Sequence, residues 1–80
     1  MKNLLTFLLI HIVDHPDDVL VEEHESDFST EYLIKVNQED IGKVIGKNGR
    51  IIQAIRTIAK VRAMKEQRKI MIQLAEEVIA

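Results

Sequence analysis

The sequence predicts one small α+β domain over residues 1–80, in which a three-stranded mixed sheet is covered on one face by helices. Two long segments carry apolar residues at helical spacing, and three short segments alternate apolar and polar residues with the period of a strand. The last alternating segment follows a helical one, which favours a crossover connection and mixed strand pairing. A hydrophobic fraction of 46% in 80 residues is enough for one modest core and argues against disorder.

The N-terminal half predicts one helix and two strands. The helix is expected from about Lys2 to His15, because its leucines recur at helical spacing and Pro16 disfavours helix in the residue before it. Residues 19–25 predict a strand whose glutamates lie on an outer face or edge in water. A turn over residues 26–30 leads to a second strand, in which Tyr32, Ile34 and Val36 share one face.

The C-terminal half predicts two helices and the third strand. A short helix over residues 41–45 begins after two acidic residues, which suit a helix N-terminus, and ends at Gly46. The long helix runs from Arg50 to about Glu66 along a stripe of isoleucines. Residues 70–74 alternate as the third strand, and Glu76–Ala80 is expected to be a short tail.

A G-x-x-G loop joins the two C-terminal helices. Gly46 and Gly49 allow backbone conformations that a Cβ atom opposes, and without side chains they let a phosphodiester approach the main chain. The loop opens onto the start of a helix, where unpaired N–H groups and the helix dipole favour negative charge. Lys47 and Arg50 add full positive charges at the same place. The loop therefore predicts a contact with the phosphate backbone of a nucleic acid.

The net charge of −2 conceals a separation of charge along the chain. The segment from Ile41 to Lys69 contains nine Lys and Arg residues and one acidic residue, Glu66, so its net charge is +8. The rest of the chain has two Lys residues against twelve carboxylates, which gives −10. A basic segment in an acidic chain favours a polyanionic ligand for that segment.

Other classes of function have weak support. The sequence contains no cysteine, nucleophile–base set or convincing carboxylate pair, so we expect no enzymatic activity and no small-molecule substrate. His11 and His15 have metal-ligand spacing, but a packed helix end explains them more simply, and we expect no metal or cofactor. The run from Gly42 to Lys47 is one residue short of a P-loop, and Asn48 stands where that loop needs Ser or Thr.

The apolar run Leu4–Val13 is too short to span a membrane, which takes about 20 residues. It also lacks the small-residue cleavage site of a signal peptide. A cytoplasmic protein with no membrane partner is therefore expected.

The order of elements, with G-x-x-G between the last two helices, resembles the type II KH domain. The similarity extends to small stand-alone bacterial KH proteins of the KhpA type through four runs: Asp14–Asp17; Val19, Val21 and Glu22; Asp40–Lys47 with Gly49 and Arg50; and Ala54–Thr57. The resemblance covers nearly the whole chain. It implies single-stranded RNA binding, no enzymatic activity, self-association as a homodimer, and pairing with a larger Jag-type KH protein. A role as an RNA chaperone or post-transcriptional regulator is the corresponding expectation.

The expected RNA site is a phosphate-holding loop beside an apolar groove that takes about four bases. The two C-terminal helices would form one wall, and the second strand around Ile34 to Val36 would form the other. The candidate RNA-binding residues are Gly46, Lys47, Asn48, Gly49, Arg50, Ile41, Lys43, Val44, Ile45, Ile52, Ile34 and Val36.

Two alternatives remain open: a dimerisation or adaptor module with little RNA affinity of its own, and a binder of single-stranded DNA. Two surfaces are candidates for self-association, namely the first helix and the long helix around Ile58, Val61 and Met64.

Overall fold

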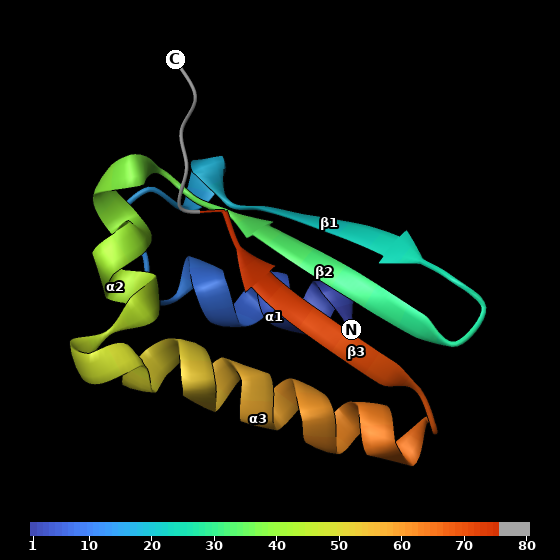
Figure 1. The fold of residues 1–80 in the computed structure, drawn as a ribbon. Coiled ribbons are helices and arrows are strands. Elements are labelled where there is room, and N and C mark those ends of the chain that lie inside the picture. Colours follow the sequence, from blue (N-terminus) through green and yellow to red (C-terminus); the bar gives the residue numbers. More distant parts are fainter. Residues whose placement is uncertain (76–80) are drawn as a thin grey trace.

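The computed structural model describes residues 1–75, so the predicted tail at 76–80 lies outside the described residues. Within that range the predicted α+β class and the order α-β-β-α-α-β are confirmed (Figure 1). In chain order the elements are α1 (Lys2–Ile10), β1 (Leu20–Glu25), β2 (Ser29–Lys35), α2 (Ile41–Ile45), α3 (Arg50–Lys65) and β3 (Lys69–Leu74). Short 3-10 turns occur at Pro16–Asp18, Gln38–Asp40 and Lys47–Gly49.

The sheet of the described chain has the order β1-β2-β3, with β2 in the centre. The β1–β2 pair is antiparallel and the β2–β3 pair is parallel, which confirms the predicted mixed sheet. The inward side chains come into register across the strands, with Val21 opposite Ile34 and Tyr32 opposite Ile72. Because side chains alternate between the two faces of a sheet, these residues share the face that the helices cover.

The core lies between this face of the sheet and the helices. Leu5 and Leu9 of α1 are completely buried, as are Ile34 of β2 and Val44 of α2. The buried residues of the long helix are Ile52, Ile55, Ala59 and Ala63, so only part of the predicted isoleucine stripe is buried, and Ile58 is 45% exposed. In Figure 1, α3 runs alongside β3 and α1 lies behind the sheet. The glycine loop therefore sits at one end of the helical layer.

The end of α1 differs from the prediction. The helix ends at Ile10 rather than at His15, because the following residues are held by a distant side chain. The carboxylate of Asp40 accepts hydrogen bonds from the backbone N–H groups of Asp14, at 3.1 Å, and His15, at 2.9 Å. Asp40 is almost completely buried. This tertiary contact competes with helical hydrogen bonding, and Pro16 then begins a 3-10 turn.

The second strand begins earlier than predicted, at Ser29 instead of after Thr30. The Ser26 amide donates a hydrogen bond to the Ser29 carbonyl at 2.8 Å, which closes the hairpin one residue pair beyond β1. Arg68 supports the same turn by donating from Nη2 to the Thr30 hydroxyl at 2.9 Å. These contacts extend the ladder into the segment predicted to be a loop.

A helix C-terminal motif directs β3 back along α3. Gln67 adopts φ +57°, the Arg68 amide donates to the Ala63 carbonyl at 3.0 Å, and the Gln67 amide donates to the Met64 carbonyl at 3.2 Å. This is the bonding of a Schellman motif, with Gln67 in the left-handed position usually taken by glycine. The tight reversal makes β3 the neighbour of α3.

Candidate nucleic-acid interface

The G-x-x-G loop is a tight turn between two helices. α2 ends at Ile45 and α3 begins at Arg50, so the loop residues are the whole connection. Gly46 has φ +76° and ψ 175°, Asn48 has φ +58° and Gly49 has φ +74°. Three positive φ values within four residues explain the two glycines, and asparagine tolerates the left-handed region better than most residues. Lys47, Asn48 and Arg50 are exposed, as a contact with phosphate requires.

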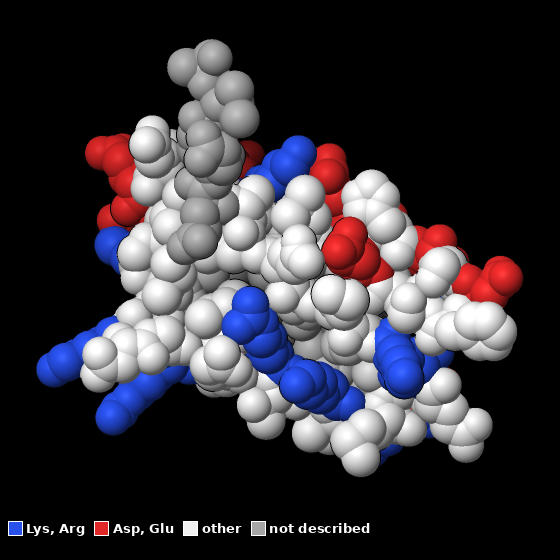
Figure 2. All heavy atoms as spheres, in the orientation of Figure 1, with Lys and Arg blue, Asp and Glu red and all other residues white. Residues whose placement is uncertain are grey.

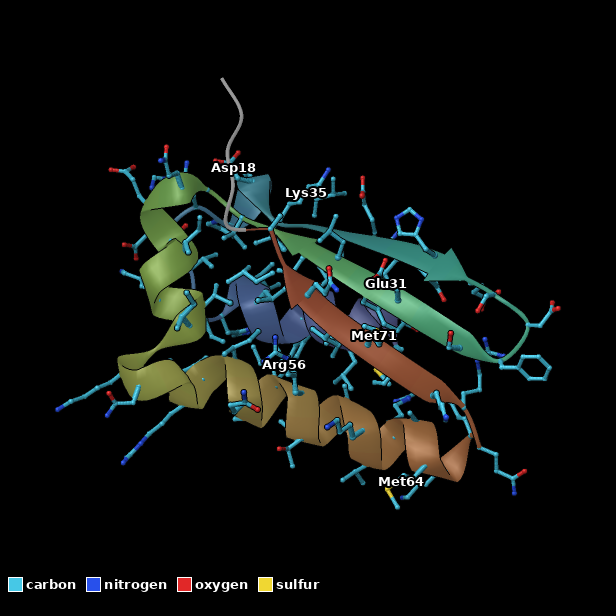
Figure 3. All side chains as sticks on the ribbon, viewed as in Figure 1. Asp18, Glu31, Lys35, Arg56, Met64 and Met71 are labelled. Atoms are coloured by element: carbon cyan, nitrogen blue, oxygen red, sulfur yellow. The ribbon has the colours of Figure 1, made fainter. Side chains whose placement is uncertain are left out.

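A groove starts beside this loop and runs between α3 and β3. Its first hollow is lined by Ile45, Ile52, Arg56 and Leu74. The next hollow shares Arg56 and is lined by Lys60 and by Ile70, Met71, Ile72 and Gln73 of β3. Figure 3 places Arg56 between the two elements, with Met71 farther along β3. The structure therefore brings the predicted residues Ile45 and Ile52 together with a strand that the prediction did not include.

The strand that lines these two hollows is β3, and the predicted wall around Ile34 and Val36 of β2 does not line them. β2 is the central strand, with β1 paired on one side and β3 on the other. The Ile34 side chain has no exposed surface, and Val36 is packed against the core. β3 is an edge strand beside α3, so its outer backbone and the side chains of Ile70 and Leu74 border the groove.

The remaining predicted residues divide into exposed and supporting groups. Val44 is completely buried, so its side chain supports the groove from below and does not line it. Ile41 is partly buried at the start of α2, and it does not border the two hollows described above. Lys43 is exposed but forms an ion pair with Asp14.

The Lys43–Asp14 pair changes the charge that the loop region presents. The hydrogen bond and charge of Lys43 lower the pKa of the Asp14 carboxyl, and Asp14 in turn raises the pKa of Lys43. Both groups therefore remain ionised over a wide pH range, and the pair has little net charge. Of the predicted basic residues, Lys47 and Arg50 are the ones whose charge is directed to solvent at the loop.

Basic side chains follow the groove. In Figure 2 most Lys and Arg side chains project from the loop or lie along the band between α3 and β3, whereas the Asp and Glu side chains lie over the β1–β2 hairpin and over the start of α2. The charge separation predicted from the sequence is thus also a separation in space. A positive groove beside a negative edge restricts where a polyanion can bind.

Arg56 lines the groove and was not among the candidate RNA-binding residues. Its Nε donates a hydrogen bond to the Ile72 carbonyl at 3.3 Å, which fixes the side chain across the groove. The same bond shows that the carbonyl of Ile72 faces away from β2. The sequence contains one indication of this role. Arg56 follows Ile52 by one helical turn and therefore lies on the same side of α3.

The histidines with metal-ligand spacing have other contacts. His11 Nδ1 lies 2.7 Å from the Phe7 carbonyl oxygen, and His15 Nε2 lies 3.2 Å from a carboxylate oxygen of Glu39. Within residues 1–75, no three His, Cys, Asp or Glu side chains are grouped in a way that could hold a metal ion. No helix in that part of the chain has the length and apolar character needed to cross a membrane.

Comparison with known proteins gives a consistent result. The family model described as "KhpA/KhpB, KH domain" matches residues 2–74. The RNA-binding protein KhpA of Listeria monocytogenes strain EGD-e is 41% identical over 76 residues, which cover 95% of this chain and 100% of the relative. The protein of the same name from Clostridium perfringens is 45% identical over 74 residues, covering 92% of this chain and 99% of the relative. No solved structure matches the chain significantly.

Proposed function

This chain belongs to the KhpA/KhpB family of KH domains, and on that basis we propose that it binds single-stranded RNA without catalysing a reaction. The observation that carries the proposal is the continuity of the glycine loop with the groove between α3 and β3. The loop offers backbone and two exposed cations, and the groove offers an apolar floor with an edge strand. The relatives named RNA-binding proteins support the same ligand.

The phosphate backbone of the RNA is held at the loop. Gly46 and Gly49 present main chain that a phosphate can approach, and Lys47 and Arg50 neutralise its charge. The loop holds a backbone segment of about four nucleotides, as in other KH domains. This contact is independent of base identity.

The bases lie in the groove that begins at Ile45 and Ile52. Their faces rest on aliphatic side chains, and their edges meet the outer backbone of β3 and the guanidinium of Arg56. An edge strand suits this role because its outer N–H and C=O groups are not used in a sheet ladder. The groove thus supplies the base contacts that the loop lacks.

The binding by one domain is expected to be weak and sensitive to salt, because the site has few phosphate contacts. A dimer, or a second KH unit on the same RNA, would raise the affinity through effective concentration. Such a protein suits the role of an RNA chaperone or post-transcriptional regulator in the cytoplasm.

The test is a double substitution in the loop, Lys47→Asp with Asn48→Asp. Both side chains are exposed, so the fold should be retained by circular dichroism, while binding of a fluorescent single-stranded RNA should be lost. The matched control is Lys2→Asp with Asn3→Asp, which makes the same chemical change at exposed positions of α1. If the loop variant binds RNA as well as the control does, the proposal fails and an adaptor role with little RNA affinity takes its place.

Competition between RNA and DNA oligonucleotides of one sequence, at one salt concentration, tests the choice of nucleic acid. RNA should compete more strongly when contacts to the 2′-hydroxyl contribute to binding. Equal competition would show a general binder of single strands.

We further propose that the chain self-associates through a surface shared by α1 and α3. Phe7 is 58% exposed, Ile58 is 45% exposed and Val61 is 53% exposed. A hollow lined partly by Leu4, Ile58 and Val61 joins the two helices, so the two surfaces left open by the sequence form one face. Met64 lines hollows on the other side of α3. The same face would suit a larger Jag-type KH partner, which the joint KhpA/KhpB family description supports.

Sedimentation of a Val61→Glu variant tests this surface, and the expected result is a shift from dimer to monomer. Gln73→Glu is the control, because it adds the same charge at an exposed position of β3. A variant that sediments as the wild type does would exclude the surface.

A further inference from the structure

The groove between α3 and β3 continues well beyond the part that the loop serves. The hollow beside Arg56 shares Lys60, Ile70 and Met71 with a third hollow farther along the two elements. That third hollow shares Met64, Arg68 and Lys69 with a fourth, which ends at Phe28 and Gln67. Because each hollow shares lining residues with the next, the surface forms one continuous trough from Ile45 to Phe28. α3 alone is roughly 24 Å long at about 1.5 Å per residue.

Phe28 stands at the far end of this trough. It lies in the turn between β1 and β2 and is 85% exposed, so it contributes nothing to the core. Met64 of α3, 75% exposed, lines the same hollow. An aromatic ring exposed in this way is available for stacking, and the thioether of methionine adds a polarisable surface.

The turn that carries Phe28 is fixed to the end of the trough. Arg68 donates from Nη2 to the Ser26 carbonyl and to the Ser29 carbonyl, each at 3.3 Å, and to the Thr30 hydroxyl at 2.9 Å. Ser26 also donates from its amide to the Ser29 carbonyl. The guanidinium therefore ties the hairpin turn to the loop between α3 and β3, so the turn that carries the ring has a defined place relative to the trough.

The charge along this extension is mainly positive. Lys60 and Lys69 line the middle and end of the trough, and the ion pairs within residues 1–75 involve neither of them. The acidic groups near this end are Glu25, Asp27 and Glu31 on the hairpin and Glu66 at the end of α3, which pairs with Arg62. The basic side chains thus lie along the trough and the acidic ones of the hairpin along its β2 side, as the band of colour in Figure 2 shows.

We propose that this distal end of the trough is a second RNA subsite, in which Phe28 stacks on a base of the strand that continues beyond the loop-proximal groove. A ring that can stack on any base, in line with free lysines, is the arrangement that binds single strands without sequence preference. The inference rests on the proposed RNA binding and extends the length of RNA that the domain contacts. The loop serves about four nucleotides, and the distal subsite takes a base farther along the same strand.

A tryptophan placed at residue 28 reports directly on stacking. The chain contains no tryptophan, so Phe28→Trp introduces a single fluorophore. An octanucleotide RNA should quench its emission, whereas a tetranucleotide should bind at the loop and leave the emission unchanged. Leu20→Trp is the matched control, because Leu20 is 48% exposed on β1, which β2 separates from the trough, and its emission should respond to neither RNA. Octanucleotide binding with no quenching at residue 28 would overturn the proposal.

Phe28→Ala gives the energetic test. It should weaken binding of the octanucleotide by about fivefold or more, the lower end of the loss for one stacked base, and leave tetranucleotide binding unchanged. A variant that loses self-association on sedimentation while it binds the octanucleotide normally would make Phe28 a protein contact and overturn the subsite. If the wild type binds neither RNA, the proposed function itself fails; if it binds both equally well, only the distal subsite fails.

Discussion

Gly46 lies so close to Ile51 that a Cβ atom at residue 46 would come within 2.6 Å of the Ile51 Cγ1 atom and within 2.9 Å of its Cβ. The backbone of Gly46 is also in a region that is essentially restricted to glycine, with φ +76° and ψ 175°. Gly49 differs in both respects. It adopts the left-handed helical region, at φ +74° and ψ 15°, and a Cβ atom there would meet nothing within 4 Å.

We therefore expect the two loop glycines to respond differently to substitution. Gly46→Ala should lower the free energy of unfolding by roughly 2–4 kcal/mol, because strain from the backbone adds to the clash with Ile51. Gly49→Ala should cost about 1–2 kcal/mol, the penalty of the left-handed region alone.

Gly42→Ala is the control for the two loop variants. Gly42 is in α2 with open space around it, so alanine should raise the stability by about 0.5–1 kcal/mol. Urea denaturation followed by circular dichroism measures all three variants. Equal losses at residues 46 and 49 would contradict the close contact with Ile51.

The buried carboxylate of Asp40 connects the start of α2 to the segment after α1. It is 1% exposed and accepts the amides of Asp14 and His15. Asp40→Asn should lower the free energy of unfolding by roughly 1–3 kcal/mol, because the amide NH2 group would face a backbone donor and leave it unpaired. Glu39→Gln makes the same change at an exposed neighbour and should stay within about 0.5 kcal/mol of the wild type. Similar losses in both variants would refute the role of Asp40.

Local patterns were sufficient to predict the elements and the loop. Glycine ends α2 and shapes the turn before α3, and Ile52 and Ile55 of the isoleucine stripe identify the buried side of the long helix. These features depend on residues only a few positions apart. The end of α1 depends instead on Asp40, more than twenty residues away, and the prediction extended the helix to His15.

The groove could not be assembled from such patterns. Ile34 with Val36, and Ile70 with Ile72, alternate in the same way, and only the order of the strands decides which pair borders α3. The ion pair between Lys43 and Asp14 likewise joins residues distant in the chain. The surroundings of Phe28 could not be predicted for the same reason, because the contact of its turn with Arg68 joins residues distant in the chain.

The Lys43–Asp14 pair predicts a gain in RNA affinity. Asp14→Asn should release the Lys43 ammonium and remove a negative charge from the loop region, which should strengthen RNA binding by roughly two- to fivefold at low salt, the scale of an exposed ion pair. The gain should decline as salt is added, because salt screens exposed charges. Asp17→Asn, which removes an acid from the neighbouring turn, is the control. An unchanged affinity in Asp14→Asn would show that Lys43 does not contact the RNA.

Tyr32 predicts a loss of stability at alkaline pH. Burial raises the pKa of its hydroxyl above the ordinary value, and the nearby carboxylate of Glu23 adds to the effect. The unfolded chain therefore ionises first. The stabilisation is complete below the ordinary pKa of about 10 and is lost as the pH rises through the folded value.

The titration can be measured on one group, because the chain has a single tyrosine and no tryptophan. Phenolate absorbance should appear at a higher pH in the folded protein than in the protein unfolded in urea. Tyr32→Phe should lose less stability than the wild type does between neutral pH and a pH above ~10. Coincident absorbance titrations in the folded and unfolded states would rule out the shift.

Arg56 predicts a preference among bases in the groove. Its Nε is held by the Ile72 carbonyl, which leaves the two terminal nitrogens of the guanidinium for a base edge with two adjacent acceptors. Guanine presents such an edge through N7 and O6, whereas adenine presents an acceptor beside a donor. An oligouridine carrying one guanine should therefore bind more tightly than the same oligomer carrying adenine, by about fivefold or more, the low end for a bidentate arginine contact.

Arg56→Lys keeps the positive charge but loses the planar pair of terminal nitrogens that can bond two acceptors at once. The variant should therefore bind both oligomers with nearly equal affinity, and the contribution of the phosphate contacts should remain. Arg62→Lys is the matched control, because Arg62 pairs with Glu66 at 3.6 Å and does not line the groove beside β3, and it should keep the preference for guanine. Moving the single guanine through the oligouridine locates the position at which the preference arises. A preference that survives in Arg56→Lys would assign base selection to the edge of β3 instead.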